Sequence, residues 1–276
     1  LGLLLVGVSV VRWERQKAAR IKTTVAKLNG SGIDAPFGGD TTLIAEAQEY
    51  LRKGRVFENG REGLWEVHAY RMYHASRIRL DTLPLADVHE DVCFAIDREA
   101  ACIALVAMAK VESSAARRSG MSASTSTSAL EAADTNATVD KYTEARDLYV
   151  RLANIWNMLK SNVSVAEEAA HHTSVALHKA MLCALAVNDP WTASDAVKLG
   201  LALDETAFQE SVQYKRMKQT LELFSNTDVD AFASAITQWE DEWHLSRWMH
   251  RMHGAALGAM KTSCVKFIRS ARPDED

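Results

Sequence analysis

Apolar residues recur every three or four positions along most of the chain, a pattern typical of amphipathic helices. One clear stripe runs through 142–159, and a second stripe of mostly small residues runs through 166–187. Similar periodicity predicts helices over 41–57, 61–79 and 85–111. No segment shows the alternation of apolar and polar residues that a half-buried strand requires. The pattern therefore predicts an all-α protein.

Helix start signals divide the second half of the chain. Asp189 precedes Pro190, which suits the first helical position, and Asp204 and Asp228 stand where two further helices begin. Long helices joined by short turns favour a tetratricopeptide-like superhelical solenoid of antiparallel helical hairpins over 41–268, with a C-terminal helical cap. The strict repeat consensus is absent, so helix lengths and turns carry this prediction.

The segment 113–138, SSAARRSGMSASTSTSALEAADTNAT, differs in kind from its surroundings. It is rich in Ser, Thr and Ala and has almost no large apolar residue to bury. Burial of apolar area is what offsets the entropy lost on ordering a chain. The composition therefore predicts a flexible Ser/Thr-rich loop.

The overall composition narrows the function classes. The chain has 276 residues, only four prolines and a net charge of −4, so it lacks the basic excess of a general nucleic-acid binder. Its four cysteines lie far apart, without a CxxC pair. We expect reduced core cysteines rather than disulfides or zinc ligands, and no cofactor.

No catalytic constellation is present in the sequence, which predicts a protein that is not an enzyme. His250 and His253 lie one turn apart with His244 upstream, a spacing that could hold a metal. No matching carboxylate or cysteine accompanies them, so we interpret them as surface or core histidines. The pair at 171–172 is interpreted in the same way.

Residues 1–28 combine an apolar stretch, LGLLLVGVSVV, with a cluster of basic residues. Eleven apolar residues are fewer than the roughly 20 that span a bilayer. They could form the end of a span whose start is missing, with Trp13 at the interface, or a buried amphipathic helix. The candidate membrane-contact residues of this segment are Leu3, Leu4, Leu5, Val6, Val8, Val10, Val11 and Trp13.

Several short motifs occur in the order in which one known family carries them. They are FGGD at 37–40, KYTEARDLY at 141–149, HKAMLCAL at 178–185, KRMKQTLE at 215–222, VDAF at 229–232 and HLSRW at 244–248. Together these motifs resemble the soluble NSF attachment proteins, the SNAP adaptors, over about 37–260. We predict a loop over 29–40, and the resemblance implies that Phe37 within it belongs to a membrane-touching loop.

The resemblance also implies partners and the residues that contact them. Family members bind an acidic SNARE helix bundle through basic residues, and they recruit the AAA+ ATPase NSF through C-terminal acids. The corresponding candidates here are Arg71, Arg77, Lys215 and Lys218 for the basic contacts and Glu222 for the acidic one. Trp239, Trp243 and Trp248 are expected to close the solenoid, because a terminal repeat lacks a neighbour.

The departures from the family pattern concern the acidic residues. In the stretch TLELFSNTD at 220–228 only Glu222 is retained, and Ser225 and Asn226 replace two acids. The acidic tail at 269–276 ends in Asp-Glu-Asp without the family's leucine.

Two functions remain open from the sequence. One is a membrane-tethered SNAP-like scaffold, an accessory subunit of a multi-subunit membrane complex, for which a mitochondrial membrane is one suitable location. The other is a working SNAP adaptor on the cytoplasmic face of endomembranes, which binds SNARE bundles and recruits an NSF-type ATPase. Three departures from the family pattern favour the scaffold: the lost acids, the Ser/Thr-rich segment in place of a hairpin, and the additional N-terminal apolar segment.

Overall fold

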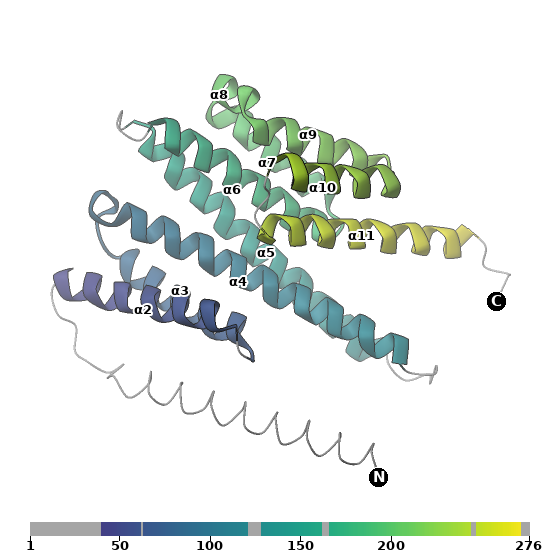
Figure 1. Cartoon of the computed structure of the whole chain (residues 1–276), viewed down its shortest axis with the longest axis horizontal. Coiled ribbons are helices and arrows are strands. Elements are labelled where there is room, and N and C mark those ends of the chain that lie inside the picture. Colours follow the sequence, from purple (N-terminus) through teal and green to yellow (C-terminus); the bar gives the residue numbers. More distant parts are fainter. Residues whose placement is uncertain (1–39, 62, 121–127, 162–165, 244–246, 272–276) are drawn as a thin grey trace, which may run out of the picture. The chain divides into compact units, whose positions relative to one another are not determined.

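The chain folds into helices joined by short turns (Figure 1). The computed structural model describes residues 40–61, 63–120, 128–161, 166–243 and 247–271, and it contains no strand in these ranges. The all-α prediction is confirmed. In order, the helices are α2 (Asp40–Gly60), α3 (Trp65–Leu80), α4 (Leu85–Gly120), α5 (Ser128–Leu159), α6 (Ala166–Ala186), α7 (Pro190–Leu203), α8 (Glu205–Glu210), α9 (Val212–Ser225), α10 (Val229–Trp243) and α11 (Arg247–Ala271).

The first of two compact units extends to Cys102 and contains α2, α3 and the beginning of α4. α2 and α3 form a hairpin and pack along their length (Figure 1). Tyr73 of α3 is fully buried, and its ring lies edge-on to Phe94 of α4 at 6.0 Å between centroids. Its hydroxyl donates to Glu58 of α2 at 2.9 Å, so one side chain ties the three helices together.

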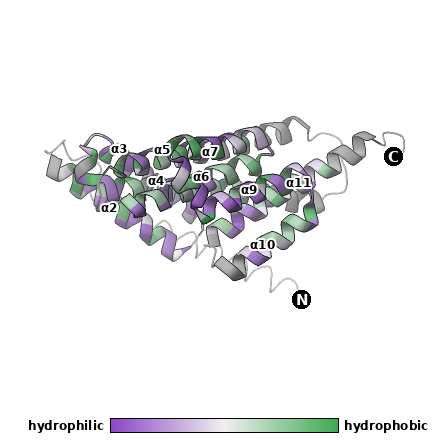
Figure 2. Cartoon of the chain, turned by 90° about the horizontal axis from the view of Figure 1, so that it is seen from above, coloured by the Kyte–Doolittle hydropathy of each residue, from purple (hydrophilic) through white to green (hydrophobic). Residues whose placement is uncertain are grey.

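The second unit begins at Ile103 and is organised around α6. α5 and α7 pack against α6, α9 also contacts it, and α11 returns to pack on it. The residues of α6 between 173 and 185 are Ala, Leu, Met and Cys for the most part, and nearly all are buried. A helix that is apolar on most of its sides requires such neighbours. Most other helices carry both hydrophobic and hydrophilic residues (Figure 2).

The predicted helix starts are confirmed by their capping hydrogen bonds. The carboxylates of Asp189, Asp204 and Asp228 accept backbone N–H groups three residues ahead, at 3.0, 3.0 and 2.9 Å. Pro190 takes the first position of α7. Hydrogen bonds to Thr192 hold the pKa of Asp189 below its usual value. These caps satisfy N–H groups that the helix itself leaves without a partner.

The structure differs from the prediction of a loop at 113–138. α4 continues through 113–120, and α5 already begins at Ser128, so both flanks of that segment are helical. The residues 121–127 lie outside the described ranges. Alanine favours helix, and extending an existing helix avoids the cost of nucleation. Helix therefore forms here without a large apolar face.

The predicted membrane-contact residues lie in 1–39, outside the described part of the chain. Their assignment, including that of Trp13 and Phe37, stays a prediction. In the part that the structure describes, no helix is long and apolar enough to cross a membrane.

Candidate functional site

Three of the sequence-predicted partner residues lie on one exposed face of α9. Lys215, Lys218 and Glu222 are three and four residues apart, and this spacing places them on the same side of a helix. The structure exposes all three. We call them the outer face of α9. The side chain of Ser211 caps the helix by accepting the N–H of Tyr214 at 3.0 Å.

The end of α9 next to this face is exposed and uncharged. Ser225 is the last helical residue, and the backbone N–H of Asn226 donates to the carbonyl of Glu222 at 3.0 Å. Thr227 follows with a positive φ of 58°, which turns the chain into α10. All three of these residues are exposed. The two positions at which the resemblance expects acids thus present only polar side chains to solvent.

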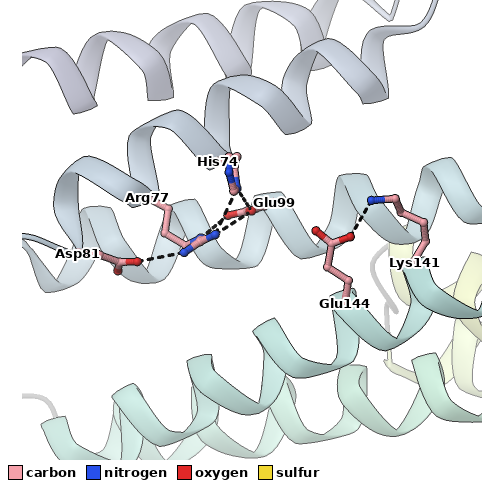
Figure 3. Close-up of polar contacts among 6 residues, drawn as sticks. All are labelled: His74, Arg77, Asp81, Glu99, Lys141 and Glu144. Carbon is pink, nitrogen blue, oxygen red and sulfur yellow. Dashed lines mark hydrogen bonds and ion pairs between the residues drawn. The ribbon is translucent and has the colours of Figure 1, made fainter.

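Arg71 and Arg77 of α3 differ in their surroundings. Arg71 is exposed, whereas Arg77 points toward α4 (Figure 3). The Nε of Arg77 donates to Glu99 at 2.5 Å, and its terminal nitrogen donates to Asp81 at 3.0 Å. Burial lowers the pKa of Arg77, but the two carboxylates outweigh this and leave that pKa raised. The predicted partner contact at Arg77 is thus already bound within the protein.

Glu99 is the residue that sequence reasoning missed in this network. Its side chain is 1% exposed, and it also contacts the Nδ1 of His74 at 2.7 Å (Figure 3). Arg77 and Glu99 lie 22 residues apart in the sequence, so the ion pair cannot be predicted from the spacing of residues along one helix. Figure 3 also shows a local pair on α5, where Lys141 donates to Glu144 at 2.6 Å.

Other arginines of the first unit are also bound to acids. Arg79 donates to Glu46 of α2 at 2.9 Å, and Arg98 of α4 donates to Glu58 of α2. These pairs connect neighbouring helices. Of the two basic candidates on α3, Arg77 is likewise bound to acids, and Arg71 is the exposed one.

The tryptophan residues of the C-terminal helices make interior contacts. Trp239 of α10 is 2% exposed, and its ring centroid lies 5.3 Å from that of His253 in α11. Trp248 of α11 lies edge-on to Tyr149 of α5 at 5.4 Å, and Lys179 of α6 lies 5.3 Å from both rings. These contacts support the predicted structural role of Trp239 and Trp248. The side chain of Trp243 lies outside the described residues.

Two histidines face each other in the interior of the second unit. His178 of α6 and His253 of α11 are fully buried, with ring centroids 5.4 Å apart. Burial lowers the pKa of His253 to about 4 and that of His178 well below its ordinary value. Among the described residues, no group of three His, Cys, Asp or Glu side chains could hold a metal ion. The sequence offered core placement as one interpretation of His253, and it did not single out His178.

Comparison with known proteins identifies one family. A family model described as soluble NSF attachment protein, SNAP, matches residues 100–256, which is more than half of the chain. No curated protein and no solved structure matches. The matched range contains α9, Trp239 and Trp248. SNAP proteins are non-enzymatic adaptor scaffolds with a tetratricopeptide-like helical solenoid, the fold predicted from the sequence. The chain therefore belongs to the SNAP family.

Proposed function

We propose that this protein is a non-enzymatic SNAP-like scaffold, tethered to a membrane through residues 1–28, that binds a protein of a multi-subunit membrane assembly. The observation that carries the proposal is the surface at α9. Its outer face keeps the exposed Lys215, Lys218 and Glu222, while the adjoining Ser225 and Asn226 are exposed and uncharged.

The missing acids bear on recruitment of an NSF-type ATPase. The resemblance implies that family members contact the ATPase through acids at the end of this helix. Exposed charges at an interface steer association, and their loss slows it and weakens binding. A surface that retains Glu222 alone is therefore expected to recruit the ATPase poorly. It still presents two lysines, which suit an acidic protein partner.

The tether is proposed from the sequence of residues 1–28. An apolar stretch followed by basic residues suits a helix that enters a bilayer and leaves its cations outside. A mitochondrial inner membrane and the cytoplasmic face of endomembranes both fit this arrangement. Screening of charge releases a protein held by electrostatics alone but leaves an inserted apolar segment in place.

The second candidate function is a working SNAP adaptor that binds SNARE bundles and recruits the ATPase. The exposed Lys215, Lys218 and Arg71 favour it, since an acidic helix bundle would be attracted to basic residues. Arg77 adds little to this attraction, because Glu99 and Asp81 already bind its guanidinium.

One experiment separates the two functions. The full chain is purified in mild detergent, and stimulation of an NSF-type ATPase on SNARE bundles is measured beside a known SNAP. The scaffold function predicts no stimulation by the wild type and a gain in the Ser225→Glu/Asn226→Glu variant. As a matched control, Ser234→Glu adds an acid at an exposed position of α10 and should leave the assay unchanged.

The membrane fraction provides the second measurement. We expect the wild type to stay with membranes after a high-salt or carbonate wash, and a variant without residues 1–13 to be released. Wild-type stimulation equal to that of the known SNAP, together with release by salt alone, would establish the working adaptor instead.

A further inference from the structure

Four helices of the second unit meet at a buried polar cluster. It consists of His178 from α6, Arg216 from α9, Trp239 from α10 and His253 from α11, and each of these residues is at most 4% exposed. The His253 ring lies 5.4 Å from that of His178 and 5.3 Å from that of Trp239, measured between centroids. We call these four residues the imidazole cluster.

The hydrogen bonds of His253 leave one ring nitrogen inside the cluster. Its Nδ1 lies 2.8 Å from the carbonyl oxygen of Met249, one turn earlier on α11, which makes Nδ1 the donor. Its Nε2 is buried and has no partner among the described residues. Nε2 is therefore the atom at which a proton would be added, and that proton would be buried in the protein interior.

The charged groups around the two imidazoles are positive or can become positive. α9 contributes the Arg216 guanidinium and the uncharged Gln213, and α11 contributes His250 beside His253. Trp239 of α10 is uncharged. The charged residues of α7 and α8 are exposed: Asp195, Lys198, Glu205 and Glu210. None of the described groups that act on the two imidazoles is a carboxylate.

Protonation of either imidazole would therefore add a buried positive charge near the Arg216 guanidinium, with no carboxylate among the described groups that act on that imidazole. Burial of such a charge is unfavourable, and exposure to water relieves it. α6 lies between α5 and α7, which hold it in place. α11 packs on α6 and α10 and contacts α5 through Trp248, and it carries the His253 ring whose Nε2 has no partner among the described residues. α11 is the helix expected to move.

We propose that the imidazole cluster is an acid-sensitive lock, which seats α11 on α6 while both imidazoles are neutral and shifts the equilibrium toward release of α11 as the pH falls below about 6. The lock is a property of the second unit and does not depend on the proposed scaffold function. It assigns a role to His253, which the sequence alone predicts only to be a surface or core histidine.

The sign of the effect follows from the two states. Burial holds the pKa of His253 at about 4 in the seated state, against about 6.5 for an imidazole in water. The released state therefore binds more protons. The free-energy preference for the seated state is complete above about pH 6.5 and decreases as the pH falls toward about 4. Between pH 7.5 and 5.0, His253 alone raises the equilibrium constant for release about 30-fold. His178 adds to this in the same direction.

Hydrogen exchange of the full chain tests the lock. Amide protection is measured by mass spectrometry at pH 7.5 and 5.0 and corrected for intrinsic exchange rates. We expect protection in 247–264 of α11 to fall at least about 30-fold at pH 5.0, while protection in α2 and α3 changes little. Equal loss in every helix, or no loss in α11, would overturn the proposal.

Substitutions assign the effect to the cluster. His253→Gln and His178→Gln keep a polar side chain but cannot be protonated, so each should reduce the acid-induced loss of protection in α11. His171→Gln removes an exposed histidine of the same helix α6 and should leave the loss unchanged. A full wild-type response in the double variant His178→Gln/His253→Gln would also overturn the proposal. Should the double variant not fold, the wild-type comparison of α11 with α2 and α3 decides alone.

Discussion

Replacing Gly200 by alanine tests the packing between α7 and α8. The same glycine-to-alanine substitution at an open position of another helix serves as the control. Gly200 is a buried residue of α7. A methyl group at its Cα would lie 2.3 Å from Cε1 and 2.4 Å from Cζ of Phe208. Phe208 is 4% exposed and lies edge-on to Tyr214 at 5.4 Å, so its ring is closely surrounded.

The expected magnitude follows from two opposing effects. Replacing glycine by alanine inside a helix stabilises it by about 1 kcal/mol. Overpacking a buried site costs about 1–3 kcal/mol, and an overlap of this size must displace the Phe208 ring or the six-residue α8 that carries it. Gly200→Ala should therefore lower the free energy of unfolding by about 1 kcal/mol, and by up to about 2 kcal/mol.

The matched substitution is Gly254→Ala in α11, where an added methyl meets nothing within 4 Å. It should raise the free energy of unfolding by about 0.5–1 kcal/mol, because only the helix preference changes. Urea unfolding followed by circular dichroism measures both variants. Adding Phe208→Leu to Gly200→Ala should recover part of the loss. An equal gain in stability from both glycine substitutions would show that α7 and α8 do not approach each other at Gly200.

Three further predictions concern the interior. Trp239→Ala should lower the free energy of unfolding by about 3–5 kcal/mol. The control Trp191→Ala, at a site 82% exposed, should change it by less than about 0.5 kcal/mol. Similar unfolding midpoints for the two variants would contradict the burial of Trp239. Glu99→Gln removes the buried carboxylate that binds Arg77 and should cost about 3 kcal/mol; unchanged thermal unfolding would show that the pair contributes nothing. Cys264 should react with a thiol reagent well before the three buried cysteines, whose thiol pKa values burial raises; four equally fast thiols in the native protein would disprove this.

Features that depend on neighbouring residues could be predicted from the sequence. Asp189, Asp204 and Asp228 cap helices because an acid three residues before a free N–H needs no tertiary partner. The helical periodicity likewise located most of the helices and the all-α class.

The segment 113–138 shows where composition alone fails. The absence of large apolar residues argues against packing, but it is not evidence against helix. Local helix preference and packing are separate contributions, and an alanine-rich extension of a long helix needs only the first. The structure accordingly has helix at 113–120 and 128–138.

Contacts between distant residues decide the role of a charge, and they cannot be read from spacing. Arg71 and Arg77 look alike in the sequence, yet only Arg77 meets the buried Glu99 from another helix. The sequence therefore could not separate an exposed arginine from one that binds within the protein.

α9 shows the same distinction between adjacent residues and connects the two proposals. Lys215 is exposed and Arg216 is 4% exposed, because one step along a helix turns a side chain by about 100°. The outer face of α9 thus offers charge to a partner, while the inner face places Arg216 in the imidazole cluster. Release of α11 removes part of the packing around this cluster. Partner binding that requires a fixed α9 is therefore expected to weaken over the same acidic range in which α11 loses its protection from exchange.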